Sequence, residues 1–177
     1  GRGSIGFAAD GRIKPDLCFY YDATHTSDRS GSAGYTSTNH YTNFGGTSGA
    51  TPTVAGHNAL ALQMYTDGIF GNPLRTPGGT RFQNRPHSQT LKALQIACAS
   101  QYSFTSTSTD NIREHQGWGY PNLRTMYDNR NRMFIVDEEH VLRDGQSKIY
   151  KIEVTSGRPE LKIVLAYLDP PAGPAAS

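Results

Sequence analysis

The chain has 177 residues, of which 36% are hydrophobic, and a formal net charge of +2. This length is enough to bury a core, but the slight and scattered positive charge offers no basic patch, so no nucleic-acid partner is expected. No apolar run approaches the roughly 18 residues that cross a bilayer, which argues against a membrane partner.

Residues 1–47 are rich in Gly, Ser, Thr, Asn and Tyr, a composition typical of loops. The residues from Gly1 to Ser4 contain neither an initiator Met nor a signal-peptide pattern, so we expect the chain to begin within a longer protein. The short apolar run 17–21 is a strand candidate. The sequence therefore predicts a long loop region that contains one short strand.

Two cysteines, Cys18 and Cys98, each lie in an apolar run. They are too few for a disulfide scaffold. Free Cys behaves as a small buried hydrophobe, so the sequence predicts two buried free thiols, with a single disulfide between them as the alternative.

The segment 53–66 is apolar on nearly every side, which predicts a helix that is buried all round. Asp67 and Gly68 would end this helix, because glycine is the usual residue at a left-handed C-cap. A second, amphipathic helix is expected from Ser88, its N-cap, with apolar residues at helical spacing through Cys98.

The stretch 103–111 is almost entirely Ser and Thr and is expected to be a solvated loop, and a short helix is predicted at 122–127. After Arg132 the apolar period changes to two, which predicts strands at 150–154 and 161–167. So few strands do not normally form an independent sheet domain, so we expect the chain to be cut at this end as well.

The segment 44–52, Phe-Gly-Gly-Thr-Ser-Gly-Ala-Thr-Pro, carries the chemistry that the sequence suggests. Its glycines permit a tight backbone approach, and small neighbours leave Ser48 accessible at the start of a helix. Pro52 cannot donate to the helical ladder, and backbone N–H groups near Ser48 would point from the positive helix end toward a substrate. Such N–H groups could stabilise an oxyanion. The alternative is an ordinary turn with Thr47 or Ser48 as the N-cap.

Residues 46–52 and the Val-Ala-Gly at 54–56 resemble the G-T-S-x-A-x-P segment around the nucleophile of subtilisin-like serine proteases. Three further segments agree in order. Residues 4–16 resemble the S-x-G-P-x-x-D-G-R-I-K-P-D stretch upstream of that serine, and residues 116–119 resemble the Q-G-W-G before the last helix of the catalytic domain. Residues 161–171 are similar to the strand that opens a β-sandwich appended to some bacterial members.

This resemblance implies an α/β fold: the C-terminal portion of a subtilisin-like three-layer αβα domain over residues 1–131, followed by the first strands of a jelly-roll-like β-sandwich over 132–177. It implies a secreted serine endopeptidase that acts on polypeptide substrates through an acyl-enzyme on Ser48. Thr47 and Gly46 would lie at the oxyanion site, and Gly45 and Phe44 would border the leaving-group side. The catalytic Asp and His and the oxyanion Asn would lie upstream of Gly1, so the fragment alone is expected to be inactive.

Three histidines are alternative bases, because an imidazole near a serine can act as a general base. His57 falls within the predicted helix and too far along it, and His25 and His40 lie in loop-like segments, so none is assigned to catalysis. No cofactor is expected and no metal site is legible; subtilases often bind calcium, but no calcium ligand can be assigned here. Trp118 is interpreted as a packing anchor. The alternative function is a catalytically silent relative that serves as an extracellular binding or adhesion module.

Overall fold

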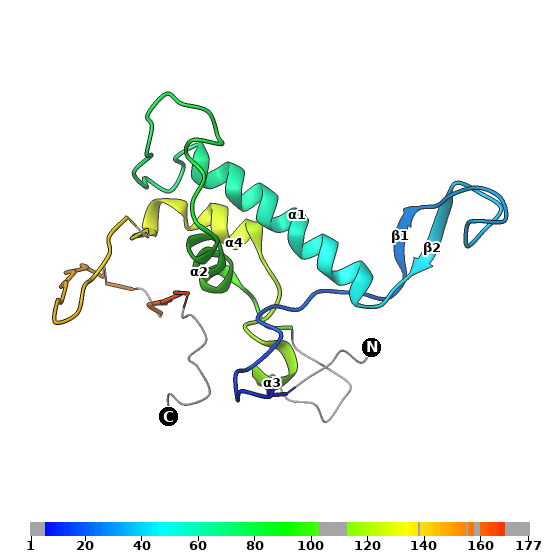
Figure 1. Ribbon diagram of the computed structural model, residues 1–177, viewed down its shortest axis with the longest axis horizontal. Helices are drawn as coiled ribbons and strands as arrows, with labels where there is room; N and C mark the ends of the chain where they lie inside the picture. Colours follow the sequence, from blue (N-terminus) through cyan, green and yellow to red (C-terminus); the bar gives the residue numbers. More distant parts are fainter. Residues whose placement is uncertain (1–5, 103–112, 138, 155, 158–159, 169–177) are drawn as a thin grey trace.

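The computed structural model describes residues 6–102, 113–137, 139–154, 156–157 and 160–168. Its elements, in chain order, are a two-stranded hairpin, a long helix, three shorter helices and a 3₁₀ turn (Figure 1). They are β1 (Thr24–Ser27), β2 (His40–Phe44), α1 (Thr47–Thr66), α2 (Ser88–Cys98), α3 (Arg113–Gln116), α4 (Leu123–Asp128) and the turn Arg130–Arg132. The loop predicted at 103–111 lies outside the described residues.

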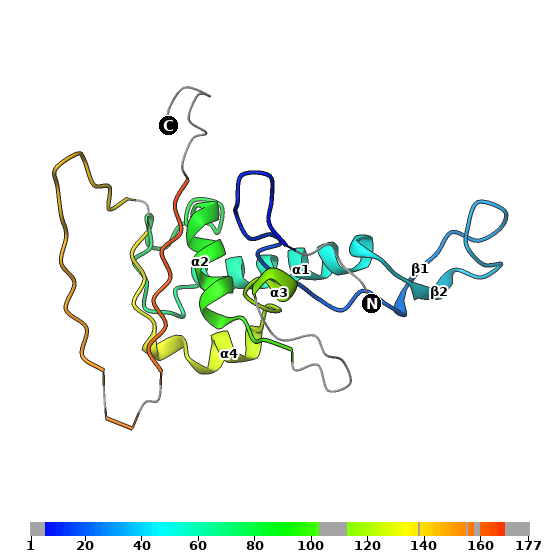
Figure 2. The ribbon, with the colours of Figure 1, turned by 90° about the horizontal axis from the view of Figure 1, so that it is seen from below.

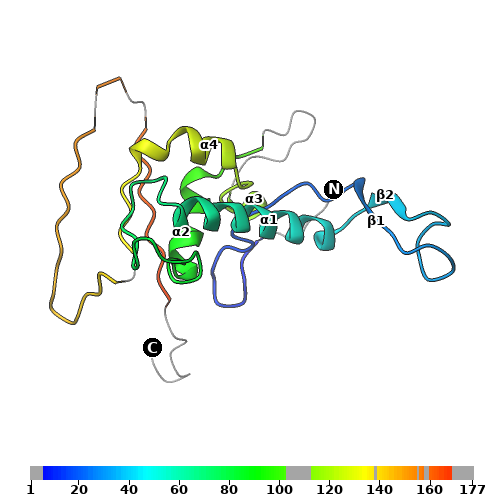
Figure 3. The same ribbon diagram turned by 90° about the horizontal axis from the view of Figure 1, so that it is seen from above.

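The core lies where α1, α2 and α4 pack together, as Figure 3 shows from above. Each of the two longer helices contributes apolar residues spaced four apart, which places them on one face. The buried cluster comprises Ala61, Tyr65, Phe70, Leu94, Cys98 and Met126. The helices predicted at 88–98 and 122–127 are thus confirmed, and they bury the faces that their patterns indicate.

Helix α1 begins at Thr47, six residues before the predicted start at 53, and contains Pro52. Proline in a helix removes the ladder bond to the carbonyl four residues back, here that of Ser48. The next residue adds a side-chain bond of its own, because the Thr53 hydroxyl donates to the Gly49 carbonyl at 2.9 Å. The helix continues through Pro52, so the proline does not mark its start.

The prediction that this helix is buried all round is wrong for the described structure. Only Gly49, Ala61, Tyr65 and Thr66 of α1 are buried, and the Leu60 side chain is 51% exposed. The helix packs on α2 and α4 only near its C-terminal end, and its N-terminal half extends away from them (Figure 2). The apolar pattern shows which residues of the helix are suited to burial, but few of the described elements pack against them, so most stay accessible to solvent.

The sheet of the described residues is the single antiparallel pair β1–β2, with Thr24 opposite Phe44 and Ser27 opposite His40. The hairpin projects from the N-terminal end of α1, away from α2 and α4 (Figure 1). The strand predicted at 17–21 does not form: among the described residues this segment makes a single backbone–backbone bond, from the Cys18 N–H to the Gly119 carbonyl at 3.0 Å. A central sheet between two helical layers, expected from the resemblance, is not seen among the described residues.

The N-terminal caps of α2 and α4 differ. Ser88 is the first residue of α2 and not its N-cap; His87 is the N-cap and makes no side-chain capping bond. Asn122 does cap α4, because its side chain accepts the Thr125 N–H at 3.0 Å. Its amide also donates to Ser100 Oγ at 2.9 Å, which ties the start of α4 to the end of α2.

Two of the sequence segments that resemble the protease family pack against each other. The backbone N–H of Trp118 donates to the Asp16 carbonyl at 2.8 Å. A Cβ at Gly117 would lie 2.2 Å from the Pro15 carbonyl oxygen. Only glycine permits this approach. Nearby, the fully buried Gln116 side chain pairs with both the backbone N–H and the carbonyl of Tyr102. The residues 10–16 and 116–119 thus form one structural unit.

After Arg132 the chain is extended, and the described residues of this part form no strand. The strands predicted at 150–154 and 161–167, and with them the start of a β-sandwich, are therefore not observed. Strands need partners for their backbone groups, and the side chains of both segments stay largely exposed. Residues 164–167 instead line a cavity of about 220 Å³ together with Lys92 and Ile96 of α2 and with Asp16 and Trp118.

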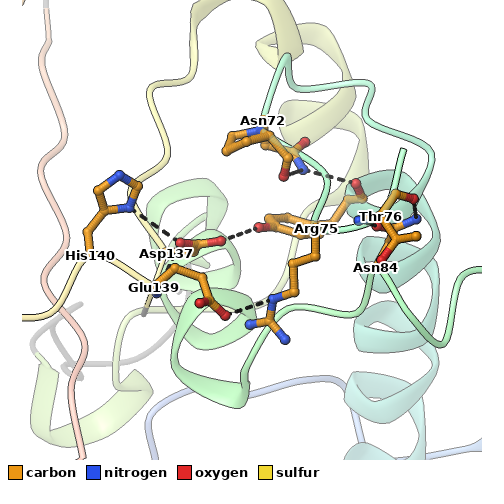
Figure 4. A network of polar contacts seen from close by, with 9 residues as sticks. Asn72, Arg75, Thr76, Asn84, Asp137, Glu139 and His140 are labelled. Carbon is orange, nitrogen blue, oxygen red and sulfur yellow. Dashed lines mark hydrogen bonds and ion pairs between the residues drawn. The ribbon is translucent and has the colours of Figure 1, made fainter. Parts of the chain in front are cut away.

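A network of polar contacts joins Asp137 and Glu139 to α1 and to the loop before α2 (Figure 4). The buried carboxylate of Asp137 accepts the Tyr65 hydroxyl at 3.4 Å and the Glu139 N–H at 3.1 Å. His140 Nδ1 lies 3.5 Å from the same carboxylate, and Glu139 pairs with Arg75 at 3.1 Å. Burial, and then the charge of Asp137, raises the pKa of Tyr65 to about 12, so its hydroxyl stays protonated and can donate at neutral pH.

Candidate active site

The turn that joins β2 to α1 positions Ser48. Gly46, the N-cap of α1, has φ +79° and ψ 178°, a conformation essentially restricted to glycine. A Cβ at Gly45 would lie 2.9 Å from the Tyr21 carbonyl oxygen, closer than a real Cβ comes to backbone. Both glycines are therefore required, the first by close packing and the second by its backbone angles.

Ser48 is the second residue of α1 and is exposed. Gly46 caps the helix without a side-chain bond, so the alternative in which Thr47 or Ser48 is an ordinary N-cap is wrong. The Gly49 and Ala50 N–H groups donate to the Gly46 carbonyl at 2.8 and 3.4 Å. Within the described residues, neither the Thr47 N–H nor the Ser48 N–H has a partner. These two donors are available at the positive end of a 20-residue helix.

The backbone behind Ser48 is held by close packing. Gly49 is buried, and a Cβ there would meet the Thr24 hydroxyl at 3.3 Å and the Phe44 ring at 3.7 Å. Strands β1 and β2 thus press against the first turn of the helix. This packing fixes the direction in which the neighbouring Ser48 side chain leaves the helix.

Phe44 belongs to a small group of aromatic rings on the hairpin. The Tyr35 ring stacks on Tyr41 with centroids 5.2 Å apart and meets Phe44 edge-on at 6.3 Å. The loop that carries Tyr35 is organised by Asp28, whose carboxylate accepts the N–H groups of Tyr35 and Thr36 at 3.0 and 2.9 Å. Burial opposes ionisation of Asp28, but these donated bonds outweigh it and lower the pKa of the carboxyl. An Asp followed by a Ser- and Gly-rich loop was the sequence signal for this hairpin, and our sequence reasoning missed it.

The histidines are not brought to Ser48. The rings of His25 and His40 lie next to each other across the hairpin, with centroids 5.6 Å apart and ring planes tilted by 50°. His57 Nδ1 lies 2.8 Å from the Thr53 carbonyl oxygen, and its ring packs on Phe19. It follows Ser48 by nine residues on the same helix, a rise of roughly 13 Å. Among the described residues no side chain hydrogen-bonds the Ser48 hydroxyl.

Both cysteines are free, as predicted, but the prediction that both are buried is wrong for Cys18. Cys98 is buried in the helical core, and its burial raises the pKa of the thiol to about 11; Cys18 is half-buried, and burial raises its pKa as well. Trp118 is 36% exposed, and the Arg113 guanidinium lies 3.2 Å from the centre of its ring. The ring of Trp118 therefore packs on Arg113, while its backbone N–H bonds to Asp16.

In the described part of the chain, no three His, Cys, Asp or Glu residues are grouped so that they could hold a metal ion. Within that part, too, no helix is both long and apolar enough to cross a membrane.

Comparison with known families gives one match. The model of the subtilase family matches residues 2–119, a range that includes the hairpin, the turn at Gly45 and Gly46, Ser48 and the segment 116–119. No individual curated protein matches the chain.

Proposed function

The chain belongs to the subtilase family of serine peptidases, whose model matches residues 2–119 of its 177, and on this premise we propose that it carries the nucleophile of an endopeptidase, Ser48. The observation that supports this assignment best is that Ser48 is exposed as the second residue of α1, next to two backbone N–H groups for which the described part of the chain provides no acceptor. Polypeptides are the substrates of this family.

In the proposed reaction Ser48 Oγ attacks a peptide carbonyl while a general base takes the hydroxyl proton. The carbonyl oxygen becomes an oxyanion, and the Ser48 N–H and the Thr47 hydroxyl donate to it. Collapse of the intermediate breaks the C–N bond, and the protonated base gives its proton to the leaving amine. An ester on Ser48 remains, and water hydrolyses it in a second round of the same steps.

The remaining residues of the turn would bind the substrate. Gly45 and Gly46 have no side chains, so they leave room for a peptide to approach the backbone closely. Phe44, at the end of β2, would border the side of the leaving group. These assignments extend the resemblance to single residues, and the packing of the turn is consistent with them.

We also propose that the base and the third oxyanion donor lie in sequence upstream of Gly1, and that the intact protein is secreted. A serine hydroxyl without a base is a weak nucleophile at neutral pH. His57 is bonded within α1, and the rings of His25 and His40 lie against each other on the hairpin, so we do not assign the base to any of these three. The peptidase part would then be incomplete in this chain.

Labelling with a fluorophosphonate probe tests the assignment in the intact enzyme. The probe should modify Ser48, and Ser48→Ala should abolish labelling and lower turnover by a factor on the order of 10⁶. Ser88→Ala, which removes an exposed serine at the start of α2, is the matched control and should label normally. Equal labelling of the Ser48→Ala variant would rule out the nucleophile.

The same experiment separates the peptidase from a catalytically silent relative. If the intact protein binds polypeptides but neither cleaves them nor reacts with the probe, the second function, an extracellular binding or adhesion module, takes its place. Reading the upstream sequence for an Asp and a His in the order Asp, His, Ser gives an independent check.

A further inference from the structure

The hairpin has one aromatic face and one polar face, and the polar face carries two histidines. Side chains alternate between the faces of a strand, so His25 and Ser27 of β1 share a face. Ser27 lies directly opposite His40 in the register of the pair. His25 is therefore a diagonal cross-strand neighbour of His40, within reach of side chains of this length.

The two imidazoles lie at the separation that a shared metal ion requires. Their ring centroids are 5.6 Å apart, and both residues are exposed. Two imidazoles bound to one tetrahedral ion, with metal–nitrogen bonds of about 2.0 to 2.1 Å, place their ring centres about 5 to 6 Å apart. Rotation of the exposed side chains could therefore bring a nitrogen of each ring to one cation, with the strands staying in place.

Neighbouring groups orient one of the rings. His40 Nδ1 lies 3.4 Å from the side-chain oxygen of Asn39, and a hydrogen bond from Nδ1–H to this oxygen leaves Nε2 with the free lone pair. The Asp28 carboxylate, one residue beyond β1, is already occupied by backbone N–H groups of the loop, so it is not available as a third ligand.

We propose that His25 and His40 form a two-histidine site for a divalent transition-metal ion, of which Zn²⁺, Ni²⁺ and Cu²⁺ suit imidazole ligands, with water completing the coordination. The site is distinct from the nucleophile and does not depend on the proposed peptidase activity. A metal bound there links β1 to β2 toward the loop end of the hairpin, where Ser27 pairs with His40, so it would stabilise the hairpin whether or not the protein is an enzyme.

Calorimetric titration of the full chain, free of any histidine tag, with ZnCl₂ at neutral pH tests the proposal. The native chain should bind Zn²⁺, and His25→Gln and His40→Gln should each weaken binding about tenfold or more, since loss of even an outer-shell partner of a metal ligand costs that much. His57→Gln is the control, because His57 is bonded within α1, and it should bind as the native chain does.

A second measurement covers the case in which a variant perturbs the hairpin. The Asp28 N–H donates to the Asn39 carbonyl at 2.8 Å across the hairpin, so its exchange with solvent should slow when Zn²⁺ is added to the native chain. Absence of Zn²⁺ binding, binding that survives both substitutions, or binding that depends on only one of the two histidines would each overturn the two-histidine site.

Discussion

Gly46 sets the direction in which the chain enters α1, and its backbone angles are those that residues with a Cβ avoid. Replacing it with Ala should therefore destabilise the junction between β2 and α1 by roughly 1 to 3 kcal/mol. No atom lies within 4 Å of a Cβ built at Gly46, so the cost comes from the backbone alone. Urea unfolding followed by helical circular dichroism measures it, together with hydrogen exchange at the Ala50 amide.

Gly56→Ala is the matched control for this prediction. Gly56 lies inside α1, has ordinary helical angles, and a Cβ there meets no atom within 4 Å. Alanine at such a position should stabilise the helix by about 0.5 to 1 kcal/mol. If the two variants change stability in the same direction, the backbone angles of Gly46 do not determine the junction.

At the scale of single elements, prediction succeeds where the residues of one segment decide the outcome. The helices at 88–98 and 122–127 follow from apolar residues at helical spacing, and the predicted C-terminal end of α1 at Thr66 agrees with the structure. The hairpin was missed because its strands are short and polar, and because one contact that holds it, between Thr24 and Gly49, joins residues far apart in the sequence. The segment 17–21 has strand-like residues but no partner strand.

The cap of α4 gives a test at this scale. Asn122→Ala removes both the acceptor for the Thr125 N–H and the donor to Ser100, and should destabilise the chain by about 1 kcal/mol. Asn122→Asp keeps the acceptor and should cost less. Arg124→Ala is the control, because it breaks only an exposed ion pair with Asp128 and should stay within about 0.5 kcal/mol of the native chain in urea unfolding.

Asn122→Asp also separates the two roles of the side chain. A loss of stability equal to that of Asn122→Ala would show that the bond to Ser100, which ties α4 to the end of α2, matters and that the cap of the helix does not.

At the scale of the whole molecule, the motif around Ser48 indicated the family and the turn, and the family match agrees with it. The three-layer αβα architecture could not be predicted in the same way, because helices and strands form layers only where each has others to pack against. The alternating apolar pattern at 150–154 and 161–167 satisfies the requirements of a strand, yet both segments remain unpaired in the described structure. A pattern gives the preference of a segment, whereas the structure depends on what lies beside it.

The last prediction concerns the 177-residue chain by itself. Its exposed apolar side chains should make it marginally stable, and it should lack peptidase activity. Ile149 and Leu165 are 85% and 84% exposed, and much of α1 faces solvent, so a dye that reports apolar surface should bind strongly. Without a base beside Ser48, neither casein cleavage nor fluorophosphonate labelling is expected. Cleavage that Ser48→Ala abolishes would contradict this prediction. It would show that a base lies within these residues, with His25 and His40 as the first two to replace.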